Sequence, residues 1–505
     1  MSLLIKGGEV IDGSGKAPIK GDVLVAGGRI AAIGDLASYK ADEIINASGC
    51  FVAPGFINIA SPSDRHLSFF SDRLNGDALI EGITTAVCGT GGVSLAPISG
   101  GSPDAASNWS KWESLNVDWK SFSDLFSIMD KIRCGINLSF LAGYDSVKNP
   151  LAKKKRGLNR DESSVVAQSL FRSVQDGCLG ISLSAETLKG DYLSPDEIKI
   201  LTSLLRTKSA VFAMDFPFGE EKSSKYVEKA ADWASYGSSI IINRFSRVST
   251  PAGLGRGGSV ADKETEKSFS ILESSSVGGR ITASVCPLPF EEISLYEIIP
   301  ENAIGRAPKD TAANIIKKRS SAALEKKWPI EKLAKLWIAD SPKAEFLTGK
   351  TVAEFSSNRE LGSAECFSKL VELSDGRMSF FLEEDDNEAR RRAIRDPRII
   401  IESATYESIG KRSDFHKKIS GSFVKFIEAS SEAGMPIEKT IAKITSLPAM
   451  ACNLIKRGFI SEGFAGDITI IRDKKPEQVI VNGVVAAQEG LVTGNRGGKV
   501  IKRNV

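Results

Sequence analysis

The chain has 505 residues, of which 42% are hydrophobic and 26% are charged. This is the composition of a folded globular protein and excludes a disordered or fibrous one. Lysine and arginine total 66 against 63 aspartates and glutamates, so the net charge is only +3. Such a small charge gives no field that would draw the protein onto DNA, RNA or anionic lipid. We therefore expect neither a nucleic-acid partner nor a membrane partner.

The cysteines and the amino-terminal sequence indicate the cellular compartment of the protein. Seven cysteines are scattered along the chain without a CxxC pair, which is typical of buried, reduced thiols. No run of eighteen apolar residues occurs, and the opening MSLLIKGGEVIDG lacks the basic and apolar regions of a signal peptide. The sequence predicts a cytoplasmic protein.

Both ends of the chain show strand patterns. Short alternating segments separated by glycines fill residues 3–6, 9–11, 23–25, 29–33 and 43–46. Strand patterns return near the carboxyl end in GDITIIRD, EQVIVNG and VVAAQEG. Because these strands enclose the rest of the chain, we predict one β-sandwich built from residues 1–53 and 450–505.

Between the ends, apolar strands alternate with amphipathic helices, which is typical of βα units around a parallel sheet. The predicted strands are FINIA, TTAVCGT, INLSFLAGY, GISLSAE, AVFAMDF, SIIINRF, RITASVCPL and RIIIES. Eight strands suit a closed barrel. The fold class is therefore predicted as α/β: a (β/α)8 TIM barrel over residues 54–449. A lysine-rich helical segment at about 290–370 is inserted before the last barrel strand.

Histidine is scarce in this sequence, because only His66 and His416 occur. Imidazole is the commonest protein ligand for zinc-type ions. A metal centre with several histidines is therefore excluded.

Several longer strings resemble the amidohydrolase superfamily, most closely its N-acyl-D-amino-acid deacylase (D-aminoacylase) branch. They are the opening LLIKGGEVIDGSGKAPIKGDVLVAGGRIAAIGDL, then FVAPGFINIA, GITTAVCGTGGVSLAPI at 82–98, TSLPAMACNL, KRGFISEGFAGDITI and VIVNGVV. The resemblance spans nearly the whole chain. It implies the same barrel, flanked by a β-sandwich made from both termini.

The resemblance also implies where the family's metal ligands and catalytic aspartate would fall, and other residues occupy those positions here. They are Asn58, Ala60 and Pro62 after the first strand, Gly91 after the second, Met214 on the fifth, Asn243 on the sixth and Ala404 on the eighth. Metal-assisted amide hydrolysis needs an ion that lowers the pKa of a water molecule and a base that moves its proton. We therefore expect no metal and no cofactor.

Polar side chains do remain at the strand ends, where such a barrel places its pocket. They are Asp64, Asp215, Asn243, Glu402 and His416. These residues suit an acid/base pair, or an oxygen-only Mg²⁺ or Ca²⁺ site made by Asp64, Asp215 and Glu402. The structural alternative is that they are loop-end residues satisfied by hydrogen bonds. The pattern does not assign a catalytic role to any one of them.

A basic cluster, His416, Lys417 and Lys418, precedes the last barrel helix. It keeps part of a family motif and would bind a ligand carboxylate when the imidazole is protonated. The alternative is an exposed basic loop. If the barrel mouth binds a small molecule, we expect a small anionic ligand at these residues.

Two functions follow from these observations. Replacement of all the ligands together favours a catalytically degenerate amidohydrolase-like protein, a pseudoenzyme retained for binding, assembly or scaffolding. Its partner would be another protein, a second copy of the chain or a small anion. The alternative is a hydrolase of C–N (non-peptide) amide bonds, such as those of N-acyl-D-amino acids, with a metal-independent or rebuilt site. A fold alone does not decide between them.

Overall fold

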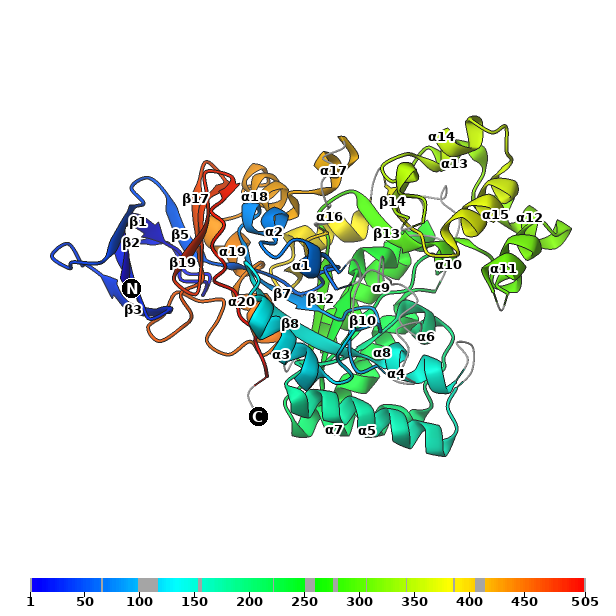
Figure 1. The fold of residues 1–505 in the computed structure, drawn as a ribbon, viewed down its shortest axis with the longest axis horizontal. Helices are drawn as coiled ribbons and strands as arrows, with labels where there is room; N and C mark the ends of the chain where they lie inside the picture. The colour runs from blue at the N-terminus through cyan, green and yellow to red at the C-terminus, as the bar shows by residue number, and fades with distance from the viewer. Residues whose placement is uncertain are drawn as a thin grey trace.

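A computed structural model describes residues 2–503, except 65–66, 99–116, 153–156, 221, 250–258, 276–279, 306, 342, 385–386 and 405–413. It has three parts in a row: a β-sheet made from both chain ends, a central barrel, and the inserted segment on the far side (Figure 1). None of the helices in the described ranges is long and apolar enough to cross a bilayer.

The two ends of the chain share one nine-stranded sheet. Its amino-terminal strands are β1 (Ser2–Val10), β2 (Ile19–Ala26), β3 (Arg29–Gly34), β4 (Glu43–Asn46) and β5 (Phe51–Pro54), and its carboxyl-terminal strands are β17 (Ile468–Arg472), β18 (Lys475–Val481), β19 (Val484–Gln488) and β20 (Leu491–Val492). The ends join where β17 pairs antiparallel with β5, with Ile470 opposite Val52. Both side chains are buried in the core of this sheet.

Eight parallel strands form the barrel, and all eight were predicted from the sequence. In chain order they are β6 (Phe56–Asn58), β7 (Ile83–Cys88), β8 (Asn137–Gly143), β9 (Gly180–Leu183), β10 (Val211–Asp215), β11 (Ser239–Asn243), β12 (Ile281–Val285) and β16 (Ile400–Ile401). Neighbours in this order are paired in the sheet, as expected for successive βα units. The predicted TIM barrel with an additional β domain is confirmed.

Alternation along each strand decides which side chains reach the barrel interior, because successive residues point to opposite faces. On β10, Phe212 and Met214 pack in the outer core between strands and helices, whereas Val211 and Ala213 pack in the inner core. Asp215 continues the inward series. Met214 therefore faces the helices, and the inward-facing residue at the end of β10 is Asp215.

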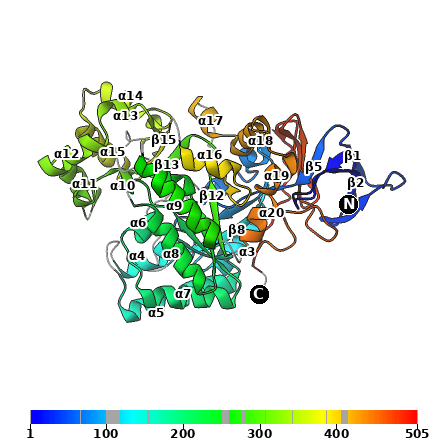
Figure 2. The ribbon, with the colours of Figure 1, turned by 180° about the vertical axis from the view of Figure 1, so that it is seen from behind.

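Amphipathic helices cover the barrel, and the view from behind shows several of them side by side (Figure 2). They include α3 (Phe122–Ile132), α5 (Arg160–Asp176), α7 (Pro195–Thr207), α8 (Ser224–Ser235), α9 (Ser259–Ser275), α16 (Glu388–Arg395) and α18 (Ser422–Glu432). Helix α7 shows why they begin where they do. Ser194 and Glu197 form a reciprocal capping box, and Pro195 occupies the first turn.

The inserted segment lies between β12 and β16 and has a core of its own. The sequence predicted helices there, and the structure adds three strands, β13 (Phe290–Ser294), β14 (Leu336–Asp340) and β15 (Ser379–Glu383), in an antiparallel sheet. Its helices are α10 (Leu295–Ile298), α11 (Pro308–Ile315), α12 (Lys318–Lys327), α13 (Ile330–Leu333), α14 (Val352–Ser357) and α15 (Ser363–Ser374). The strand signal was missed because lysine-rich helical stretches dominate the composition around it. The segment stands apart from the terminal sheet, across the barrel (Figure 2).

Candidate functional site

A row of hydrogen-bonded side chains crosses the carboxyl ends of four adjacent barrel strands. Asn243 on β11 donates its amide to Asp215 Oδ1 on β10 at 3.3 Å. Ser284 on β12 lies 3.2 Å from Asn243 Oδ1 and 2.5 Å from Oε2 of Glu402, which follows β16. All four side chains are buried. The structure thus brings together three of the predicted residues, Asp215, Asn243 and Glu402, through a serine that the sequence had not singled out.

Glu402 is the titratable group of this row. Burial raises the pKa of its carboxyl to about 7, and the nearby carboxylates of Asp215 and Glu291 act in the same direction. The hydrogen bond from Ser284 and the charge of Arg244 lower the pKa but do not cancel the effect of burial. A carboxyl that titrates near neutral pH is suited to general acid/base chemistry.

Arg244 supplies the positive charge beside this row. Its Nε lies 3.3 Å from Asp215 Oδ2, and its Nη2 lies 2.7 Å from Glu292 Oε2. Nη1 also donates to the backbone oxygen of Glu292 at 2.8 Å. The backbone of Arg244 has a φ of 59°, a region that costs a non-glycine residue on the order of 1 kcal/mol. The guanidinium is therefore held in place from both sides of the barrel mouth.

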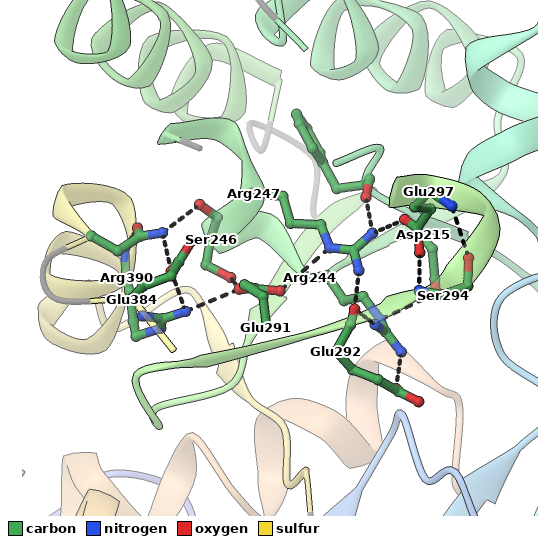
Figure 3. A network of polar contacts seen from close by, with 12 residues as sticks. Asp215, Arg244, Ser246, Arg247, Glu291, Glu292, Ser294, Glu297, Glu384 and Arg390 are labelled. Carbon is green, nitrogen blue, oxygen red and sulfur yellow. Dashed lines mark hydrogen bonds and ion pairs between the residues drawn. The ribbon is translucent and has the colours of Figure 1, made fainter. Parts of the chain in front are cut away.

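A larger ionic network continues from Arg244 into the inserted segment (Figure 3). Arg247 lies 3.3 Å from Glu291 and 3.0 Å from Glu297, and Arg390 lies 3.0 Å from Glu291 and 2.8 Å from Glu384. Three arginines thus face the six carboxyls of Asp215, Glu291, Glu292, Glu297, Glu384 and Glu402. Carboxyls outnumber the arginines in this buried space, and the charges of Asp215 and Glu291 add to the effect of burial, which is the main cause of the raised pKa of Glu402.

The side chains of Asn58 and Glu81 connect β6 and the turn before β7 to the segment next to Glu402. Asn58, at the end of β6, donates to the backbone oxygen of Ser403 at 3.0 Å and accepts from its N–H at 3.1 Å. Glu81 accepts from the Ser403 hydroxyl at 3.1 Å and from the Gly421 N–H at 2.6 Å. Asn58 and Glu81 therefore fix the segment that carries Glu402.

A small cavity of about 40 Å³ adjoins Glu402 and Arg244. Ala60 and Pro62 form part of its barrel wall, and Phe290 and Phe381 from the inserted sheet form part of the opposite wall. A volume of this size has room for a water molecule. The carboxyl of Glu402 is thus placed beside a space that water can occupy.

The residues of this site do not fit the metal set that the resemblance implies. Alanine and proline at positions 60 and 62 carry no ligand atom, and Met214 points away from the mouth into the outer core. Cys88 also packs in that outer core. Across the described ranges, His, Cys, Asp and Glu side chains are not gathered in any group of three or more that could hold a metal ion. The oxygen-only site of Asp64, Asp215 and Glu402 is therefore not assembled.

Asp64, in the loop after β6, takes part in a hydrogen bond between two barrel loops. Its carboxylate is buried and accepts the backbone N–H of Gly89 at 2.8 Å. This contact ties the loop after β6 to the end of β7. His66 lies outside the described residues.

The cluster of His416, Lys417 and Lys418 lies on α17 (Asp414–Ile419). His416 is half-buried, and burial lowers the pKa of its imidazole. Lys418 lies over the ring of Trp337 at 4.7 Å and 3.9 Å from Glu383, both in the inserted sheet. Lys417 is exposed. The three side chains thus have different surroundings, and none of the contacts above joins them to Glu402.

Comparison with known proteins gives relatives along the full chain. A D-aminoacylase of Alcaligenes xylosoxydans xylosoxydans is 22% identical over 99% of this chain and 97% of its own length. An N-acyl-D-glutamate deacylase of the same organism is 24% identical over 93% of this chain and 87% of its own. No protein-family model matches.

Solved structures agree with the sequence relatives. The N-acyl-D-glutamate deacylase of Bordetella bronchiseptica, solved with zinc and a phosphonate inhibitor, and a D-aminoacylase each superpose with a TM-score of 0.78. Each is 20% identical and matches over 99% of both chains. The resemblance to the D-aminoacylase branch is confirmed. Glu402 lies at the carboxyl-terminal end of the barrel strands, the face at which TIM barrels in general carry their active sites.

Sequence reasoning missed Ser284, Arg244 and Glu81 in this D-aminoacylase-like chain. Ser284 had a signal, because a hydroxyl between the apolar Ala283 and Val285 must find a partner once it is buried. The sequence gives no such signal for Arg244 or Glu81. An arginine after a strand and a glutamate after a helix look like ordinary surface residues when only the sequence is considered. Their partners lie on segments distant in the chain.

Proposed function

We propose that this chain hydrolyses the C–N amide bond of an N-acylated amino acid, with Glu402 as its general acid and base. The observation that carries the proposal is the buried Glu402 carboxyl at the end of the barrel, with a pKa of about 7 and a water-sized cavity beside it. The substrate class comes from the relatives, which are deacylases of N-acyl-D-amino acids.

In the proposed reaction, the ionised Glu402 takes a proton from a water molecule in the adjacent cavity. The water oxygen attacks the amide carbonyl carbon, and Arg244 supplies positive charge near the oxygen that becomes negative. The C–N bond then breaks, and Glu402 returns its proton to the leaving nitrogen. The products are a carboxylic acid and a free amino acid. One water molecule is consumed for each amide bond that is cleaved, and Glu402 ends each cycle ionised.

The proposal is tested with a panel of N-acetylated D- and L-amino acids, using release of the free amine as the measurement. Glu402→Gln keeps the shape of the side chain but cannot accept a proton, so we expect a loss of activity of about 10²-fold or more. Glu432→Gln, a change at an exposed residue of α18, is the matched control and should keep the wild-type activity. A chelator should leave the wild-type rate unchanged. Wild-type activity that survives in Glu402→Gln contradicts the assignment.

A second candidate is a binding protein without turnover, and the alanine and proline in the cavity wall favour it. Under this proposal the mouth holds a ligand but does not cleave it. A phosphonate analogue of an N-acyl amino acid then raises the melting temperature, because it binds only the folded state. None of the amides is hydrolysed at any pH. Such a protein would act by binding a protein partner or a second copy of itself.

For either candidate, we propose that helix α17 contributes the contact to a ligand carboxylate through His416, Lys417 and Lys418. Burial lowers the pKa of His416, so its charge is present only below its ordinary value of 6.5. Binding of a carboxylate should therefore strengthen as the pH falls below 6.5. His416→Ala should remove that pH dependence and leave the contribution of the lysines, as measured by thermal shift.

A further inference from the structure

Two cavities lie at the opposite end of the barrel from Glu402, between the barrel and the terminal sheet. Their volumes are about 540 and 520 Å³. They adjoin, since both are lined by Gly27, Gly28, Asn482, Lys499 and Val500. Leu138 on β8 and Leu179 just before β9 mark this as the amino-terminal face of the strands. Each cavity is within the size range of small-molecule sites.

The walls of these cavities are strongly basic. Seven basic residues line them, against the single acidic residue Asp130: Arg29, Arg133, Lys456, Arg457, Arg496, Lys499 and Lys502. The whole chain has a net charge of only +3. Positive charge is therefore concentrated in these two adjoining cavities, which together with their seven basic residues we call the basic groove. It is balanced by acidic residues elsewhere on the molecule.

Among the residues that the structure describes, only one of these seven cations has a carboxylate partner. Arg457 forms an ion pair with Asp467. In the described part of the chain, none of the ion pairs involves the other six. Like charges gathered in one groove repel one another and lower the stability of the fold. Packing of the core does not require a group of cations at this place. An anion bound among them would relieve their repulsion.

The backbone around the groove is fixed before any ligand arrives. The carboxyl-terminal segment runs along β8, where the N–H of Leu138 donates to the Lys499 oxygen at 3.0 Å and the N–H of Ile501 donates to the Leu138 oxygen at 2.8 Å. This segment descends from the terminal sheet past the barrel (Figure 1). Asn482 donates to Asn137 Oδ1 at 2.7 Å and to the Gly497 oxygen at 2.8 Å. Lys499 is thereby anchored at its backbone while its side chain stays exposed.

Two of the arginines are also oriented. Arg29 donates through Nη1 to the Gly463 oxygen at 2.9 Å, and Arg496 donates through Nη1 to the Ile132 oxygen at 3.0 Å. One nitrogen of each guanidinium is used in this way, and a guanidinium has further N–H groups for a ligand. The two arginines belong to different cavities. A single ligand that met both would have to carry several negative charges along its length.

We propose that this basic groove is a binding site for a small polyphosphate, either inorganic or as part of a nucleotide, separate from the barrel mouth. Guanidinium and ammonium groups are the side chains that recognise phosphate. Two adjoining cavities of this size match an extended chain of phosphates better than a single anion. Lys499 is the shared contact, because it lines both cavities.

The test uses the full-length protein and titration calorimetry with inorganic tripolyphosphate, ATP and adenosine. We expect tripolyphosphate to bind and to raise the melting temperature, and its binding should weaken as salt rises from low to physiological concentration. ATP binding more tightly than tripolyphosphate indicates a nucleotide site, and equal affinity indicates a phosphate-chain site. Adenosine alone should not bind.

Lys499→Glu should weaken tripolyphosphate about tenfold or more, since it replaces an attraction by a repulsion. Lys475→Glu, the same charge change on an exposed residue of β18, is the control and should change affinity less than about twofold. Lys456→Gln combined with Lys502→Gln serves if the first variant does not fold. The proposal is overturned if tripolyphosphate does not bind at about 1 mM, if Lys499→Glu binds as the wild type does, or if duplex DNA binds more tightly than either phosphate compound.

Discussion

Ser284 Oγ lies 2.5 Å from Glu402 Oε2 and 3.2 Å from Asn243 Oδ1. A hydroxyl has one proton, so it can donate to only one of these two oxygens at a time. When Glu402 is protonated, it can donate to Ser284, and Ser284 can donate to Asn243. The amide of Asn243 in turn donates to Asp215 at 3.3 Å. The hydrogen bonds of the row therefore change with Glu402: the ionised carboxylate accepts from Ser284, which lowers the pKa of Glu402, whereas protonation of Glu402 frees the Ser284 hydroxyl for Asn243.

Glu402 should make the stability of the protein depend on pH. Its pKa is about 7 in the folded chain against an ordinary value of 4.5, so the folded state holds a proton that the unfolded state has lost in this interval. The free energy of unfolding should fall by about 3 kcal/mol as the pH rises from 4.5 through 7. Glu402→Gln should remove this part of the dependence and be more stable than the wild type at pH 8. Urea unfolding at pH 5 and pH 8 measures the change in the free energy of unfolding. A variant with the same pH dependence as the wild type contradicts the prediction.

Removal of the Ser284 hydroxyl should move the titration of Glu402 upwards. The hydrogen bond from Ser284 lowers the pKa of that carboxyl, so Ser284→Ala raises it. If the chain is a hydrolase with Glu402 as base, the pH at which the rate reaches half its maximum should rise in the variant. Carboxyl resonances of labelled glutamate give the same pKa without any need for activity. Ser182→Ala, which removes another buried hydroxyl on β9, is the control and should leave the titration of Glu402 unchanged.

The barrel could be predicted because each strand and each helix is indicated by residues that are neighbours in the sequence. The site could not, because its contacts join residues that are distant in the sequence. Each strand is a short apolar run followed by an amphipathic helix, and the eight runs could be read one at a time. Asp215, Asn243 and Glu402 were identified as candidates because each ends such a run. Their connection through Ser284 depends on the register of neighbouring strands, such as Asp215 opposite Asn243. Arg244 and its partner Glu292 are brought together by an insertion whose strands the sequence did not reveal.

Arg390 should be essential for the junction between the barrel and the inserted segment. It is buried and lies 3.0 Å from Glu291 and 2.8 Å from Glu384. Arg390→Met leaves both carboxyls without this cation, which costs about 3–5 kcal/mol in comparable buried pairs. Arg391→Met is a matched control, since Arg391 is exposed and forms an ion pair with the exposed Glu388 on the same helix. It should change stability by less than about 1 kcal/mol. Equal effects of the two changes in thermal unfolding contradict the prediction.

The purified protein should contain no stoichiometric zinc. The inherited ligand positions hold Ala60, Pro62 and Gly91, and Met214 faces the outer core. Elemental analysis after dialysis measures the metal content per chain, and added Zn²⁺ should not raise the melting temperature at neutral pH. One tightly held transition-metal ion per chain is the result that contradicts this prediction. It would direct attention to side chains outside the described ranges, His66 among them.

Deletion of residues 456–505 should prevent folding into soluble protein. It removes β17 to β20, uncovers the edge of β5, and takes Ile468, Ile470 and Ile480 from the core of the terminal sheet. An exposed edge of this length and the lost core favour aggregation, and the loss exceeds the net stability of about 5–15 kcal/mol of a typical domain. Deletion of residues 493–505 keeps all nine strands and should yield a folded protein of lower melting temperature, because the contact between Lys499 and β8 is lost. A soluble, cooperatively folded product of the longer deletion contradicts the prediction that the two ends form one unit.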